Sequence, residues 1–211
     1  MTPTAITSLL VPYREHALPE IAIAQISTYL DLLLRWNART NLTAIRSPEE
    51  IITRHFGESL FAAQHILPAG NTLADVGSGA GFPGIPIKLS SLPSDTLHVT
   101  LIEAHQKKAT FLREVIRALH LTEIEVQPIR AEHISRTFDV VTLRAVEHFD
   151  QVLPAAARLL NPGGRIALLI GEAQFLAAQT TLPSIKWDQP RPIPNSQHRV
   201  LAIGTSPKEP N

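Results

Sequence analysis

The sequence predicts an α/β protein with a mostly parallel β-sheet, a C-terminal antiparallel hairpin and an N-terminal helical cap. Three observations predict it. Residues 1–68 carry apolar positions at helical spacing, short β-type runs alternate with helical stretches from residue 72 onward, and no helix separates the last two β-type runs. Alternating strands and helices favour a parallel sheet with helices on both faces. We therefore expect two units, a helical cap at 1–68 and the sheet domain at 69–211.

Two helices are expected in the cap. In IAIAQISTYLDLLLRWN the apolar positions recur at helical spacing, which predicts one buried face. That face consists of Ile23, Ile26, Leu30, Leu33 and Asn37. The next helix begins at Ser47-Pro48-Glu49-Glu50, where serine suits the N-cap, proline the first helical position and glutamate a capping box. A short polar connector, residues 37–46, joins the two helices.

The sheet domain is expected to contain seven strands. The first five are TLADVG, LHVTLIE, IEVQPI, FDVVTLR and RIALLI, with helical segments such as HQKKATFLREVIRALHL between them. IKWDQP and RVLAIG follow, joined by a proline-rich connection without a helix. Two strands joined in this way predict a terminal antiparallel hairpin.

Composition limits the classes of function. The 211 residues are 44% hydrophobic and 18% charged, which fits a globular protein. There is no cysteine, so disulfides, thiolate zinc sites and cysteine nucleophiles are excluded. The nine histidines are scattered and form no ligand pair, so we expect no metal site. With no signal peptide and no apolar run of membrane-spanning length, we expect a cytoplasmic protein without membrane contact.

The stretch LADVGSGAGFPG indicates a nucleotide-like ligand. Glycines at 77, 79, 81 and 84 allow the backbone to come close to a bound molecule. Gly79 to Gly84 matches the dinucleotide pattern G-x-G-x-x-G, whereas Asp75 to Gly81 equally suits S-adenosyl-L-methionine. In both cases a carboxylate about 20 residues further on would accept hydrogen bonds from ribose hydroxyls, a role that Glu103 fills.

Asp75 favours S-adenosyl-L-methionine as the cofactor. A carboxylate at the loop would repel a pyrophosphate but attract an ammonium or sulfonium group. The predicted C-terminal hairpin agrees, because a Rossmann-like seven-stranded sheet with that ending is typical of S-adenosylmethionine-dependent methyltransferases. Asp75, Gly77, Gly79 and Glu103 are therefore the first cofactor-binding candidates.

Three further residues extend the cofactor site. Ala131 and Glu132 follow the third predicted strand, where the adenine ring would lie in such a fold, although Glu132 could also simply begin a helix. Phe82 lies within the loop and could cover the methionine part of the ligand or fill the core.

The residues that each methylation chemistry requires limit the possible methyl acceptors. Pyrimidine C5 methylation uses a cysteine nucleophile, and the chain has none. Amine methylation usually places an Asn/Asp-Pro-Pro-aromatic motif after the fourth strand, where this chain has Leu143-Arg144-Ala145-Val146. The remaining methyl acceptors are those that react without a covalent enzyme intermediate. Guanine N7 is one of them, because its lone pair is nucleophilic without loss of a proton. We expect no general base, and Arg144 is the residue expected to position cofactor or base.

A group of basic residues points to RNA despite a net charge of zero, from 19 basic and 19 acidic residues. Four arginines lie between residues 35 and 54. They could hold phosphates, or they could form an ordinary solvated helix surface. The candidates for RNA contact, including asparagines of the connector, are Arg35, Asn37, Arg39, Asn41, Arg46, Arg54 and His55.

The motifs together resemble a known family. LRWNARTNLTAIRSPEEIITRHFGESL and DVGSGAGFPGIPIKL, with KKATFLREV further on, resemble the bacterial 16S ribosomal RNA guanine-N7 methyltransferase family, also called small-subunit methyltransferase G or glucose-inhibited division protein B. The resemblance implies an enzyme acting on 16S ribosomal RNA or the small ribosomal subunit, and we expect a monomer. It also places the family's S-adenosylmethionine contacts at Gly77, Phe82, Ala131, Glu132 and Arg144. The alternatives are a nucleotide- or RNA-binding module without catalysis and a small-molecule methyltransferase of the same fold.

Overall fold

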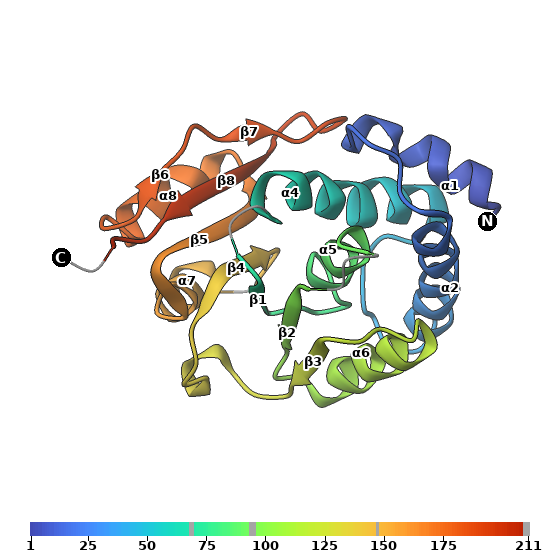
Figure 1. The fold of residues 1–211 in the computed structure, drawn as a ribbon, viewed down its shortest axis with the longest axis horizontal. Helices are drawn as coiled ribbons and strands as arrows, with labels where there is room; N and C mark the ends of the chain where they lie inside the picture. Colours follow the sequence, from blue (N-terminus) through green and yellow to red (C-terminus); the bar gives the residue numbers. More distant parts are fainter. Residues whose placement is uncertain (68–69, 93–95, 147, 209–211) are drawn as a thin grey trace.

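A computed structural model describes residues 1–67, 70–92, 96–146 and 148–208 of the chain (Figure 1). The N-terminal part contains α1 (Pro3–Leu10), η1 (Val11–Tyr13), α2 (Glu20–Asn37), α3 (Pro48–Glu50), the π-helical η2 (Ile51–Gly57) and α4 (Glu58–Ile66). The two predicted helices are therefore confirmed, and the predicted face of α2 is buried. The predicted division into two domains stays a prediction, and its boundary at 68/69 falls outside the described residues.

The start of the second helix follows the predicted capping signal in part. Ser47 Oγ accepts a hydrogen bond from the Glu50 amide at 3.2 Å, and Pro48 is the first helical residue. The carboxylate of Glu50 pairs with Arg54, at 3.2 Å, instead of returning to Ser47. The serine cap is therefore confirmed, while the glutamate stabilises the next turn.

The remaining elements form the predicted mixed sheet and its helices. They are β1 (Thr72–Val76), α5 (Gly84–Ser90), β2 (His98–Ile102), α6 (Gln106–Ala118), β3 (Ile124–Gln127), η4 (Ala131–His133), β4 (Phe138–Arg144), α7 (Phe149–Ala157), β5 (Leu160–Gly171), α8 (Ala173–Thr181), β6 (Lys186–Trp187), β7 (Arg191–Pro192) and β8 (Arg199–Thr205). The main strand order is β3-β2-β1-β4-β5-β8-β6. Strands β1 to β5 pair in parallel, and β8 pairs antiparallel with β5, β6 and β7.

Within the described residues the sheet has eight strands rather than the predicted seven. The difference lies in the proline-rich connection, where Arg191 and Pro192 pair with β8 as the short strand β7. Proline is compatible with a strand at this place because β7 is paired on one side only.

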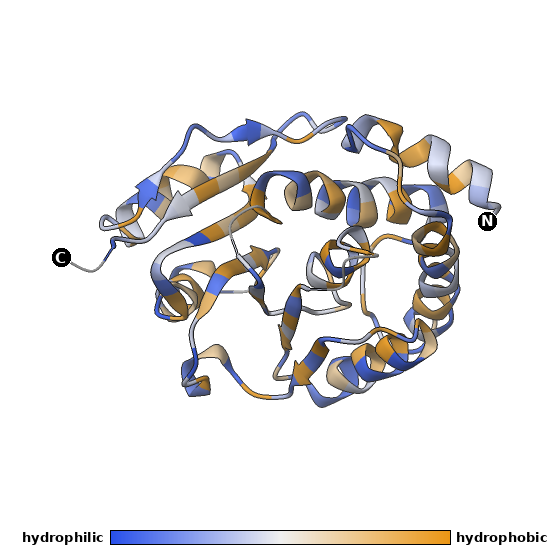
Figure 2. Ribbon diagram, viewed as in Figure 1, coloured by the Kyte–Doolittle hydropathy of each residue, from blue (hydrophilic) through white to orange (hydrophobic). Residues whose placement is uncertain are grey.

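Helices cover both faces of the sheet. On each strand, alternate residues face opposite layers, as Leu73 and Ala74 do on β1. One layer contains α1, α2, α4, α5 and α6 and is continuous from the N-terminal helices to β8, whereas α7 and α8 cover the other face. Figure 2 shows both hydrophobic and hydrophilic residues along α2 and α6, as expected for helices with one buried side. This arrangement brings the carboxyl ends of β1, β2, β4 and β5 to one edge.

Gly84, the first residue of α5, fits closely against β1 and β2. A Cβ at this position would lie 2.5 Å from Leu101 Cδ2 and 2.8 Å from Asp75 Oδ2. We predict that Gly84→Ala lowers the free energy of unfolding by about 1–3 kcal/mol, because the added methyl group has no space. Urea denaturation measures the change.

Gly171→Ala is the matched control for this substitution. The atom nearest to its added Cβ would be Gln174 Oε1, at 3.6 Å. We expect this variant to stay within about 0.5 kcal/mol of wild type. Equal stability of the two variants would show that α5 is not packed as closely as described.

Candidate functional site

The glycine-rich loop turns directly after β1 and crosses the end of β2. Gly77, Gly79 and Gly81 have positive φ angles of 69°, 58° and 90°, a region that other residues rarely adopt. The amides of Gly77 and Ser78 donate to the Ile102 carbonyl, at 2.9 and 3.1 Å. Of the atoms in the described part of the chain, a Cβ on Gly79 would meet only the Gly77 carbonyl oxygen, at 3.8 Å, so the backbone here is open to a neighbouring molecule.

Glu103 meets this loop at the end of β2. The residue is 8% exposed, and its carboxylate accepts hydrogen bonds from the Gly79 amide at 2.9 Å and the His105 amide at 2.7 Å. Each carboxylate oxygen has a second lone pair that these bonds do not use. Two predicted cofactor residues, Gly79 and Glu103, are therefore in direct contact, and the acid retains acceptor capacity.

Asp75 lies beneath the loop rather than on its surface. It is 0% exposed, with Oδ2 accepting from the Gly84 amide at 3.0 Å and Oδ1 from the Thr142 hydroxyl at 2.9 Å. Burial raises the pKa of the carboxyl to about 6, and the bonds from Thr142 and Gly84 limit that rise. The acid therefore joins β1, β4 and the start of α5.

Phe82 belongs to an aromatic stack in the core. It is buried between the Tyr29 ring, at 5.3 Å, and the His55 imidazole, at 4.8 Å, both nearly parallel to it. Tyr29 in turn donates from its hydroxyl to the Ala80 carbonyl. These contacts attach the glycine-rich loop to Tyr29 of α2 and His55 of η2.

Ala131 and Glu132 lie in η4, after β3, as the sequence predicts. Ala131 is buried in the layer of α7 and α8, and Glu132 is exposed. The parallel pairing of β1, β2 and β3 puts this segment at the same edge of the sheet as Glu103. Their contact with a cofactor stays a prediction.

Arg144, the last residue of β4, is the centre of a buried polar network. Its terminal nitrogens donate to His55 Nδ1 at 2.8 Å, to the Arg54 carbonyl at 2.8 Å and to Glu58 Oε2 at 3.0 Å. The Nε atom is buried without a hydrogen-bond partner among the described residues. The guanidinium is therefore held through its two terminal nitrogens, and its Nε–H donor is unpaired among the described residues.

Glu58 and Arg199 complete this network and were not predicted from the sequence. The Glu58 carboxylate is 2% exposed, and its Oε2 also accepts from Arg199 of β8, at 2.8 Å. Two arginines thus share one carboxylate oxygen, and Arg54 Nε lies 4.0 Å from the other oxygen, so the network carries excess positive charge. From the sequence alone, Glu58 is indistinguishable from a surface residue paired with Arg54 four positions earlier.

His55 links the network to the connector between α2 and α3. Because a guanidinium can only donate, Nδ1 accepts from Arg144, and Nε2–H donates to Thr43 Oγ1 at 2.7 Å. Burial, with Arg144 next in importance, lowers the pKa of His55 to about 2. His55 is therefore neutral near pH 7, and both of its nitrogens are occupied.

The remaining predicted RNA residues separate into two groups. Asn37 holds the Thr43 backbone through two hydrogen bonds of 2.9 and 3.0 Å, and Arg46 donates to the Asn37 carbonyl and to Asn41 Oδ1. These residues stabilise the connector. Arg35 and Arg39, in contrast, are exposed at the end of α2.

A small pocket of about 90 Å³ lies at the carboxyl ends of β4 and β5. Its lining includes Arg144, Val146, Phe149, Gln174 and Arg199. Among the described residues no group of three or more histidines and acids could hold a metal ion. No helix in the described part of the chain is long and apolar enough to cross a membrane.

The family model described as rRNA small subunit methyltransferase G matches residues 22–190. The chain belongs to this family. A Chloroflexus aggregans protein named ribosomal RNA small subunit methyltransferase G is 39% identical over 208 residues, covering 92% of this chain and 84% of the relative. A Xylella fastidiosa protein of the same name is 42% identical over 156 residues, covering 73% and 71%. The resemblance found in the sequence is thereby confirmed.

Solved structures confirm the Rossmann-like methyltransferase fold. The ribosomal protein L11 methylase of Lactobacillus delbrueckii subsp. bulgaricus superposes with a TM-score of 0.60 at 19% identity, covering 72% of this chain and 79% of that one. TYW2 of P. horikoshii, solved in complex with MeSAdo, gives 0.56 at 17% identity, covering 72% and 62%.

The shared carboxylate of the network provides a stability test. We predict that Glu58→Gln lowers the free energy of unfolding by about 3–5 kcal/mol, because it leaves the buried Arg144 guanidinium and the partly buried Arg199 guanidinium without a counter-charge. Chemical denaturation near pH 7 measures the loss.

Glu50→Gln serves as the control, since Glu50 pairs with Arg54 while both side chains are more than two-fifths exposed, at 46% and 44%. We expect a loss below about 1 kcal/mol there. Similar losses for the two variants would mean that the buried network contributes little to stability.

Proposed function

We propose that this protein transfers a methyl group from S-adenosyl-L-methionine to N7 of a guanine in 16S ribosomal RNA. The observation that carries the proposal is the contact between the Gly79 amide and the Glu103 carboxylate at the ends of β1 and β2. In a chain of the rRNA small subunit methyltransferase G family, this pair lies where a Rossmann-like sheet binds an adenosyl cofactor.

The residues at this edge fit S-adenosyl-L-methionine. The open backbone at Gly79 admits close approach, and the unused lone pairs of Glu103 can accept hydrogen bonds from two ribose hydroxyls. Ala131 and Glu132 would contact the adenine edge from η4. When bound, the cofactor supplies a methyl group on a positively charged sulfur.

Asp75 and Phe82 would act on the cofactor through the shape of the loop. Asp75 holds the start of α5 through Gly84, and Phe82 anchors the loop in the aromatic stack. We assign both a positioning role, with Gly77 and Gly79 making the closest backbone approach.

Arg144 would orient the acceptor or the cofactor. Three partners fix its guanidinium, while the buried Nε–H stays available as a donor. A donor fixed in this way can align the reacting atoms without moving a proton, which suits an in-line displacement.

A general base is not required, because guanine N7 carries no proton. His55 could not act as one, because both of its nitrogens are engaged in hydrogen bonds and its pKa of about 2 makes the imidazole a very weak base. His148 is exposed at the N-cap of α7, and Glu147 lies outside the described residues. The chain therefore contributes alignment, together with an environment that must accept a cationic product.

The substrate determines the expected setting of the enzyme. Ribosomal RNA, alone or in the small subunit, would be met in the cytoplasm. We propose a monomer, because one chain carries the glycine loop, Glu103 and Arg144.

Methyl transfer to small-subunit ribosomal RNA tests the proposed function. We expect label from methyl-labelled S-adenosyl-L-methionine in the RNA, and strand scission by borohydride and aniline at one guanine. Glu103→Gln should weaken cofactor binding by about 1–3 kcal/mol, the scale of hydrogen bonds to a charged group, as measured by calorimetry.

Glu125→Gln is the control, because that acid pairs with Arg136 beside β3 and both side chains are about half exposed, at 48% and 50%. Its cofactor affinity should equal that of wild type. Label on an amine or a hydroxyl, or scission at no guanine, would contradict the proposed acceptor.

The pH dependence tests alignment against base catalysis. We expect single-turnover rates to be nearly constant between about pH 7 and 9, since no proton leaves the acceptor. Asp75 sets the lower limit of this pH range. Its pKa is about 6, so the loop carboxylate becomes protonated in more acidic solution. Arg144→Lys should reduce the rate by about a hundredfold through lost alignment, whereas His148→Ala should leave it close to wild type. A rate that rises tenfold per pH unit would require a base.

A further inference from the structure

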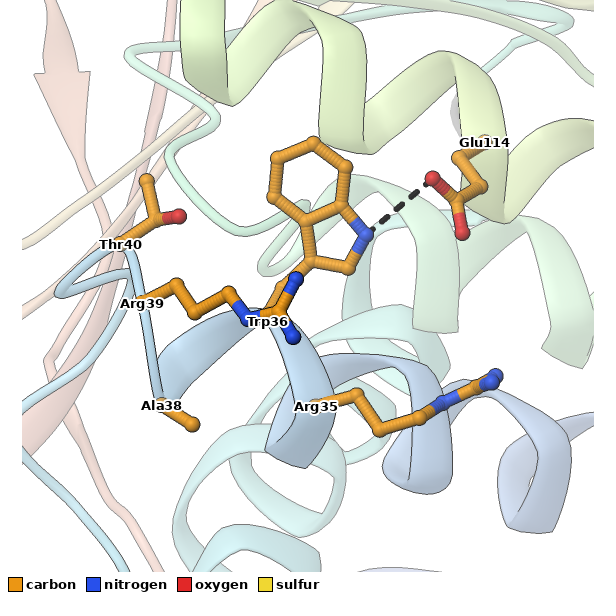
Figure 3. A pocket seen from close by; sticks show the side chains of 6 residues that line it. All are labelled: Arg35, Trp36, Ala38, Arg39, Thr40 and Glu114. Carbon is orange, nitrogen blue, oxygen red and sulfur yellow. Dashed lines mark hydrogen bonds between the residues drawn. The ribbon is translucent and has the colours of Figure 1, made fainter.

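A second pocket opens between the end of α2 and α6 (Figure 3). Its volume is about 520 Å³, and its lining consists of Arg35, Trp36, Ala38, Arg39, Thr40 and Glu114. None of these residues belongs to the glycine-rich loop or the strand ends. The size falls in the range of small-ligand pockets, roughly 300–1,000 Å³.

The floor of this pocket is a fixed indole. Trp36 packs against Phe111, with ring centroids 5.5 Å apart, and its Nε1–H donates to Glu114 Oε2 at 3.1 Å. Figure 3 shows the indole reaching from α2 toward Glu114 on α6. Glu114 Oε1 has no partner in the described part of the chain. The pocket thus combines an oriented aromatic ring with a free carboxylate oxygen.

The rim of the pocket is positively charged. Arg35 donates only from Nε, to the Asp31 carbonyl at 3.3 Å, and Arg39 has no side-chain partner among the described residues. Both side chains are exposed. The facing helix α6 carries Lys107, Lys108, Arg113 and Arg117 against the single acid Glu114. This local charge favours a polyanion although the whole chain is neutral.

We propose that this pocket binds one single-stranded nucleotide of the RNA substrate, separate from the methyl-accepting guanine. The base would lie against Trp36, Arg35 and Arg39 would hold the flanking phosphates, and Glu114 would accept a hydrogen bond from the base edge. Single-stranded RNA is recognised by this combination of aromatic stacking and basic side chains. The inference rests on the proposed function and gives the substrate a second anchoring point.

The connector relates this pocket to the methyl-transfer site. It begins at Asn37, directly beside Trp36, and Asn37 holds Thr43, whose hydroxyl accepts from His55. His55 in turn accepts from Arg144. A nucleotide seated on Trp36 would therefore lie at one end of a hydrogen-bonded path to the end of β4.

Glu114 gives the pocket a base preference. Its free oxygen can accept from the amino group of guanine, adenine or cytosine. Uracil has no amino group, and its only ring N–H is flanked by two carbonyl oxygens that a carboxylate repels. We expect weaker binding of uridine than of guanosine.

Tryptophan fluorescence tests the proposal. The chain has two tryptophans, and the Nε1 of Trp187 is buried without a partner among the described residues, so Trp187→Phe removes the second fluorophore without loss of a described hydrogen bond. In this background, short single-stranded oligoguanylate and oligouridylate are titrated at several salt concentrations. We expect quenching of Trp36, tighter for the guanosine oligomer, and a salt slope that falls by about 0.7 for each arginine removed in Arg35→Gln and Arg39→Gln.

Two further variants make the outcome specific. Arg158→Gln, an exposed arginine following α7 on the other face of the sheet, should leave quenching and salt slope unchanged. In the Glu114→Gln variant, the affinities for oligoguanylate and oligouridylate should become similar. Quenching that is absent, unaffected by both arginine variants, or produced equally by polyglutamate would overturn the proposal.

Steady-state methyl transfer separates this inference from the proposed function. If the pocket anchors RNA, Arg35→Gln and Arg39→Gln should raise KM for ribosomal RNA severalfold while kcat and S-adenosyl-L-methionine affinity stay at wild-type values. Unchanged KM in an active enzyme would overturn the anchoring role alone. A wild-type enzyme that methylates no ribosomal RNA would contradict the proposed function, while the fluorescence titration would still report on the pocket.

Discussion

The shared carboxylate of Glu58 is the interaction on which the candidate site depends. It joins Arg144 of β4 and Arg199 of β8 to the helix formed by η2 and α4. A buried carboxylate between two guanidinium groups is stable only while all three stay together, because each charge left alone would bear its full cost of desolvation. The orientation of α4 against the sheet and the orientation of Arg144 are thus consequences of one contact.

Neutral His55 extends this network without adding charge. A protonated imidazole could not accept from Arg144 and would place a third positive group beside two guanidiniums. The neutral ring passes the hydrogen bond on to Thr43 and stacks on Phe82. The connector, the glycine-rich loop and the end of β4 are therefore held by one imidazole, and alignment at this edge is a property of the assembled fold.

Two acids, Asp75 and Glu103, contact the glycine-rich loop and have different roles. Asp75 is fully buried and shapes the turn, while Glu103 is 8% exposed, binds the Gly79 amide of the turn and retains acceptor capacity. The carboxylate deepest in the fold has the raised pKa, because burial destabilises its charged form. A chemical role facing a ligand fits Glu103 better, although both acids lie at the same edge of the sheet.

The sequence alone determined the mixed sheet, the helix start at Ser47, the glycine-rich turn and the family, because these follow from periodicity, capping chemistry and local motifs. It could not decide which charged residues are structural. Arg46 and Arg54 look alike in a basic stretch with Arg35 and Arg39. Only the folded structure shows that Arg46 and Arg54 have side-chain partners, Asn41 and Glu50, whereas Arg35 contacts only a backbone carbonyl of its own helix among the described residues. The pairing of Glu58 with Arg144 spans 86 positions and arises only when helix and sheet pack together. Burial, which turns a surface-like acid into the centre of a network, is a property of tertiary structure.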